Sequence, residues 1–127
     1  MRTAFIGLAL LAPLMLGAAR DRNQVPEATP AGKPVSCIPI RSIQQSLVRN
    51  DRVIDFQMSG RKVYRNTLPS DCPQLGFQQR FAYTTSLSEL CSSDIITVLY
   101  STPLQRGASC GLGQFQPVTL APRVKAP

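Results

Sequence analysis

A chain of 127 residues with no histidine and a formal net charge of +7 is long enough for one small domain and too short for two. Without histidine, serine–histidine catalysis and zinc sites with imidazole ligands are excluded. The excess of basic over acidic residues, 14 against 7, favours anionic partners.

The first 19 residues have the pattern of a secretory signal peptide. Arg2 precedes an uncharged run of 17 residues, and Gly17 and Ala19 are small residues of the kind that signal peptidase reads. The run is shorter than the about 20 apolar residues that span a bilayer. No cysteine follows it directly to carry a lipid. We therefore expect residues 1–19 to be removed, leaving a periplasmic or secreted protein without stable membrane insertion.

A proline-rich lead follows the signal peptide. Residues 20–36 contain three prolines and no aliphatic cluster, so they cannot repay the entropy of ordering and are expected to be flexible. The last residues, 121–127, form a similar flexible tail. The domain itself is expected to be residues 37–120.

The domain is expected to begin with a meander of strands. In 46–58, SLVRNDRVIDFQM, β-favouring residues lie on both sides of the turn pair Asn50–Asp51. Over 53–58 apolar and other residues alternate, which indicates a half-buried strand. Ser59–Gly60 supplies a second turn, and a further strand is expected within 61–68.

The second half adds more strands and one short helix. RFAYTT (80–85) and DIITVLY (94–100) have the composition of strands, and 110–120 ends in a strand segment broken by Pro117. Residues 85–91, TSLSELC, are the only good helix candidate, with a serine cap and leucines at i, i+3 spacing. The fold class is therefore mainly β, a small antiparallel β-barrel or sandwich with at most one short helix.

Four cysteines lie inside the domain, and a secreted chain pairs such thiols. No two are closer than 19 residues and none has a histidine nearby, so we expect two disulfides, no metal site and no cofactor. Sequence allows three connectivities. We predict the nested one, Cys72–Cys91 with Cys37–Cys110, because the first pair lies at element ends and the second pair begins the first and last strand segments.

Cys91 is expected to be structural, because its charged neighbours Glu89 and Asp94 are acidic and disfavour a thiolate. The motif CSSD at 91–94 is better explained as a turn in which serine and aspartate side chains bond to nearby backbone groups. We expect no catalytic residue at this position.

Several phrases of the sequence together are similar to a known family. CIPIRSI, DFQMSGRKVYRNTLPSDCPQLG, FAYTTSLSELCSSDIITVL and GASCGLGQFQPV resemble a family of small secreted proteobacterial proteins described as a domain of unknown function. The resemblance covers roughly residues 37–118 and all four cysteines. It implies an envelope location and a disulfide-bearing domain, and it implies no activity.

The excess charge is partly local. Arg61, Lys62 and Arg65 lie within one predicted hairpin, where strand geometry places Arg61 and Arg65 on the same face. They are either a solvated surface or a weak anion-binding site. The sequence favours anionic envelope polymers over nucleic acid as partners, because no nucleic-acid motif is present.

Two classes of function stay open. The first is a non-enzymatic binding or structural module of the periplasm, which contacts anionic polymer or another envelope protein. The second is a hydrolase that uses two carboxylates, for which the domain offers Asp55, Asp71, Glu89 and Asp94. A third possibility is an inhibitor that inserts an exposed loop such as TPLQRGAS, 102–109, into another envelope protein. The pattern predicts no particular oligomeric state.

Overall fold

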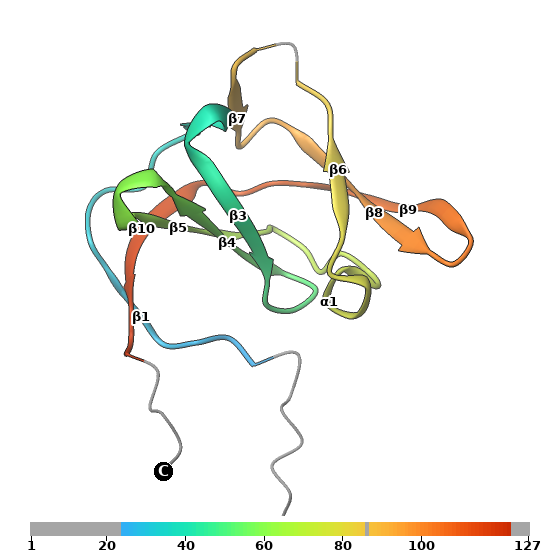
Figure 1. Ribbon diagram of the computed structural model, residues 1–127, viewed down its shortest axis with the longest axis horizontal. Coiled ribbons are helices and arrows are strands. Elements are labelled where there is room, and N and C mark those ends of the chain that lie inside the picture. The colour runs from blue at the N-terminus through green and yellow to red at the C-terminus, as the bar shows by residue number, and fades with distance from the viewer. Residues whose placement is uncertain (1–23, 86, 123–127) are drawn as a thin grey trace, which may run out of the picture.

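A computed structural model describes residues 24–85 and 87–122. Its largest layer is a five-stranded antiparallel sheet in the order β1-β10-β5-β4-β3. Consecutive strands β3, β4 and β5 form the meander, and β10 returns from the end of the chain to pair with β5 (Figure 1). The strands are β1 (Ala28–Pro30), β3 (Ile43–Val48), β4 (Val53–Met58), β5 (Val63–Thr67) and β10 (Phe115–Leu120).

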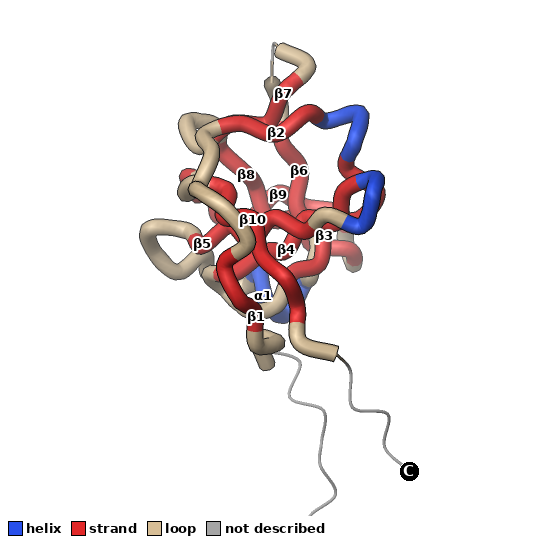
Figure 2. The backbone as a smooth tube through the Cα atoms, turned by 90° about the vertical axis from the view of Figure 1, so that its left-hand side faces the viewer, coloured by secondary structure: helices blue, strands red, loops and turns tan. Residues whose placement is uncertain are grey.

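Two smaller sheets complete the architecture. One has the order β6-β8-β9 and the other is the pair β2-β7, which lies at the opposite end of the molecule from α1 (Figure 2). The described sheets are sandwich-like and do not close into a barrel, so the predicted mainly β fold is confirmed in its sandwich form. The remaining elements are β2 (Cys37–Pro39), η1 (Ile40–Ser42), η2 (Ser59–Arg61), α1 (Leu75–Gln78), β6 (Phe81–Tyr83), β7 (Glu89–Cys91), β8 (Ile95–Ser101) and β9 (Leu104–Gly111).

The core lies between the five-stranded and three-stranded sheets. Phe56 of β4 packs edge-on against Phe115 of β10, with ring centroids 5.6 Å apart, and against Phe81 of β6 at 6.3 Å. Ile96 and Val98 of β8 are also completely buried. Such aromatic contacts contribute about 0.5–1.5 kcal/mol beyond area burial, so they help to hold the two sheets together.

The predicted hairpin at Asn50–Asp51 is confirmed, and its side chains explain the turn. The Asn50 side-chain oxygen accepts hydrogen bonds from the backbone N–H groups of Arg52 and Val53, each at 2.8 Å. Asp51 accepts a bond from the Gly76 N–H at 2.8 Å, which ties the hairpin to α1. The second predicted turn, at Ser59–Gly60, is also present, as η2 between β4 and β5.

The predicted helix over residues 85–91 is wrong. Residues 89–91 form β7, in which Leu90 lies opposite Ile38 of β2 and is completely buried. Leu87, its supposed partner on a helical face, is 65% exposed. The spacing of the two leucines was therefore misleading, because an extended backbone delivers Leu90 to the core. The one short α-helix of the described residues is α1, at 75–78.

The prediction of a flexible lead over 20–36 is also wrong for the part that is described. β1 pairs with β10, and Val35 forms an isolated antiparallel bridge with Phe115. The composition suggested disorder because the segment has three prolines and no aliphatic cluster, yet backbone hydrogen bonds to β10 hold it in place. The predicted signal peptide and residues 123–127 of the predicted tail lie outside the described residues. Over the described ranges, no helix has both the length and the apolar character needed to cross a membrane.

Two disulfides are present, and the predicted nested pairing is wrong. The bridges are Cys37–Cys91 and Cys72–Cys110, so neither Cys72–Cys91 nor Cys37–Cys110 forms. Cys37 and Cys91 are directly opposite in the β2–β7 pair, with Cα atoms 4.0 Å apart. The prediction missed that pairing because residues 85–91 were expected to form a helix, whereas 89–91 form a strand beside β2. Cys72 follows the meander and is buried in the core, where it reaches Cys110 of β9.

Candidate functional site

The three basic residues expected to form an anion site do not act together. Arg61 belongs to η2, which precedes β5, and its φ is 61°. The alternation of side chains along a strand therefore does not apply to it. Arg65 lies within β5 and binds Asp55 of β4 through two hydrogen bonds, Nε to Oδ1 at 2.8 Å and Nη2 to Oδ2 at 3.0 Å. Arg61 and Lys62 are exposed, so these two of the three predicted residues remain candidates for an anion-binding site.

Asp55 is the centre of a buried ion cluster that the sequence analysis missed. Its carboxylate is completely buried and also accepts a hydrogen bond from the Arg49 Nε at 2.9 Å. The Arg65 Nη2 donates to the Pro26 backbone oxygen at 2.9 Å, which fixes the lead beside this cluster. A usable signal existed, because a tight turn at 59–61 places Asp55 opposite Arg65. The sequence carries no comparable signal that the lead, through Pro26, lies beside this cluster.

A basic cavity of about 250 Å³ adjoins Arg61 and Lys62. Residues of β5 and β10 complete its lining, so it combines two cationic residues with mostly apolar neighbours. Among the residues that the structure describes, none of those lining it is acidic. The lining residues are Ala31, Arg61, Lys62, Val63, Tyr64, Pro117, Val118 and Thr119.

The turn at 91–94 has the geometry that the sequence predicted. The Asp94 Oδ2 accepts a hydrogen bond from the Cys91 N–H at 2.7 Å, and the Asp94 N–H donates to the Cys91 oxygen at 2.9 Å. The same aspartate lines a cavity of about 370 Å³ together with Arg106. The interpretation of CSSD as a structural turn is therefore confirmed.

The four carboxylates proposed for hydrolysis lie in different settings. Asp55 is engaged by two arginines and Asp94 by the backbone of its turn, whereas Asp71 and Glu89 are exposed. The Glu89 carboxylate lies within 4.8 Å of the Cys37 and Cys91 sulfurs, but these are joined in a disulfide and offer no thiolate to a metal. A hydrolase based on paired carboxylates stays a hypothesis.

The segment proposed as an inhibitory loop is mostly a strand. Of 102–109, the residues from Leu104 onward belong to β9, so only the tip of the β8–β9 hairpin projects. Leu104 is 75% exposed at that tip. Figure 1 shows this hairpin extending away from the rest of the fold. An insertion role would therefore rest on the hairpin tip.

Comparison with known proteins gave no match to a protein-family model, a curated protein or a solved structure.

Proposed function

We propose that this protein is a non-enzymatic binding module of the periplasm or of the secreted fraction, and that it binds an anionic polymer of the bacterial envelope at the basic cavity beside Arg61 and Lys62. The observation that carries the proposal is the composition of that cavity: two exposed cations and an acid-free lining within the described residues.

The wider charge distribution supports the same choice. Arg49 and Arg65 are paired with the buried Asp55, so their charge is partly neutralised within the fold. Arg61 and Lys62 lie at the surface, where their charges can attract a polyanion. The two disulfides are typical of a compartment more oxidising than the cytoplasm. The secretory signal pattern of residues 1–19 points to the same place.

The test is a charge reversal with a charge-matched control. The double variant Arg61→Glu, Lys62→Glu and the control Arg41→Glu, Arg106→Glu change the net charge equally, and all four side chains are exposed. Binding to two polymers, polygalacturonate and polyphosphate, is measured at low ionic strength. We expect the cavity variant to bind at least about tenfold more weakly, because two attractive contacts become repulsive. The control should keep most of its affinity.

Two outcomes would overturn the proposal. Equal loss in both double variants would show that net charge alone governs binding. Unchanged binding by the cavity variant would return Arg61 and Lys62 to a solvated surface. The two polymers separate a preference for carboxylates from one for phosphates.

A further inference from the structure

A groove of about 500 Å³ lies along β6, at the open side of the sandwich. Its lining combines residues of β3, β6 and β8 with the segment after α1. Figure 1 shows β3 and β6 on the same side of the molecule with no strand between them. The lining residues are Ser46, Gln79, Arg80, Phe81, Tyr83 and Leu99.

The groove is bordered by two unpaired strand edges. Within the described chain, β3 is hydrogen-bonded to β4 alone and β6 to β8 alone, so each has a free row of backbone donors and acceptors. Natural sheets usually protect such edges with charged residues or proline. The sequences of β3, IQQSLV, and of β6, FAY, contain neither. The opposite edges of the same two sheets are different, since β1 contains Pro30 and β9 contains Arg106.

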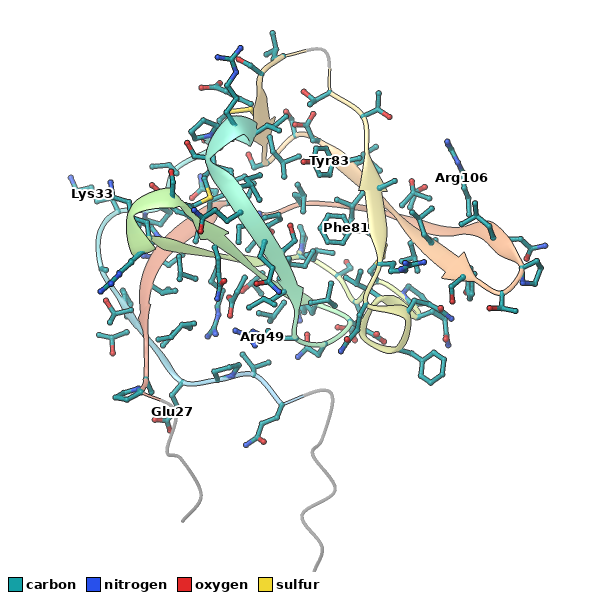
Figure 3. The ribbon with its side chains drawn as sticks, in the orientation of Figure 1. Glu27, Lys33, Arg49, Phe81, Tyr83 and Arg106 are labelled. Atoms are coloured by element: carbon teal, nitrogen blue, oxygen red, sulfur yellow. A yellow bond between two sulfur atoms is a disulfide. The ribbon has the colours of Figure 1, made fainter. Side chains whose placement is uncertain are left out.

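The side chains of the groove are suited to an extended peptide. Phe81 and Tyr83 point from β6 toward β3 and are half-buried (Figure 3). Their rings, with centroids 6.3 Å apart, offer apolar surface at the alternate positions of a strand. Arg80 is exposed at the end of this row. It is the single charged residue among those that line the groove in the described chain.

We propose that this groove binds an extended segment of a partner protein, apolar at alternate positions and acidic between them. Backbone bonds to the free edges of β3 or β6 supply affinity, the two aromatic rings receive the apolar side chains, and Arg80 pairs with the acidic side chain. The site is separate from the basic cavity, because the two cavities share no lining residue.

The experiment uses two short fluorescein-labelled peptides, one in which valine alternates with glutamate and one in which valine alternates with lysine. Fluorescence anisotropy gives the affinity of each peptide for wild type, Arg80→Glu and the control Arg106→Glu. We expect wild type to prefer the glutamate peptide by about tenfold or more and Arg80→Glu to prefer the lysine peptide. The control should behave as wild type, because Arg106 does not line the groove.

Hydrogen exchange locates the binding. Amide protection should increase over 43–48 or 81–83 when the glutamate peptide is added, and a peptide methylated on its backbone nitrogens should lose affinity. The double variant Arg61→Glu, Lys62→Glu should bind the glutamate peptide as wild type does, so this proposal and the proposed function can fail separately.

Four results would overturn the peptide proposal. The first is no saturable binding of either peptide, and the second is binding without protection at β3 and β6. The third is an equal loss of affinity for the glutamate peptide in Arg80→Glu and in the Arg106→Glu control. The fourth is a concentration-dependent dimer that protects the same edges without peptide, since the occupant would then be a second copy of this chain.

Discussion

At Asp55, a completely buried carboxylate accepts hydrogen bonds from Arg49 and Arg65, whose side chains are each 16% exposed. Burial of an ion is unfavourable unless partners replace its water. Here two guanidinium groups do so, and Arg65 uses its remaining capacity to hold the Pro26 oxygen. One aspartate therefore decides the position of an arginine that the sequence suggested as a ligand-binding residue.

Replacement of Asp55 by asparagine should be strongly destabilising. The change keeps the shape of the side chain but leaves two arginines without their counter-ion, and the loss of one partner from a buried ion pair costs about 3–5 kcal/mol. Urea unfolding at neutral pH measures the free energy of unfolding. Arg49→Gln should cost less, because Asp55 keeps its two bonds to Arg65. A loss below about 1 kcal/mol for Asp55→Asn would contradict the role assigned to this cluster.

At the scale of elements, local turn chemistry predicted what lies close in sequence and failed where pairing is distant. The β3–β4–β5 meander follows from Asn50–Asp51 and Ser59–Gly60, and it was predicted. The β2–β7 pair joins cysteines separated by 54 residues, and β1 pairs with a strand near the other end of the chain. Such pairings depend on packing in three dimensions, which short-range patterns do not encode. The sequence suggested Arg61 and Lys62 of the basic cavity but wrongly added Arg65, although its partner Asp55 lies directly opposite it in the local β4–β5 hairpin.

The two disulfides should differ in how readily they are reduced in the folded protein. Cys37 and Cys91 are both half-buried in the small β2–β7 sheet, whereas in the other bridge Cys110 is half-buried and Cys72 is completely buried in the core. Because exchange requires access of the attacking thiolate to a sulfur, mild reduction should open Cys37–Cys91 first, since both of its sulfurs rather than one can be attacked. Alkylation followed by peptide mass mapping identifies the opened bridge. Earlier opening of Cys72–Cys110, or equal rates, would show that access does not govern reduction here.

For the whole molecule, the ends of the described chain close the larger sheet. β1 forms its edge beside β10, and the Ala121 N–H donates to the Glu27 oxygen at 2.9 Å. The same lead supplies the Pro26 oxygen to Arg65. Figure 2 shows β1 beside the C-terminal end of the described chain. The lead is thus a structural part of the domain, although its composition resembles a linker.

Removal of the lead should therefore lower the stability of the whole domain. A chain that begins at residue 33 lacks β1 and the Pro26 acceptor, so β10 loses one strand partner and Arg65 loses one bond. Each lost hydrogen bond contributes about 0.5–1.5 kcal/mol, and for a domain of this size a loss of 1 kcal/mol lowers the melting temperature by about 4–8 °C. Circular dichroism should therefore show a melting temperature at least several degrees below that of a chain beginning at residue 20.

Both chains should keep their two disulfides, which a thiol titration checks. If the two chains melt at the same temperature, the lead does not stabilise the domain and the contacts of β1 are energetically neutral.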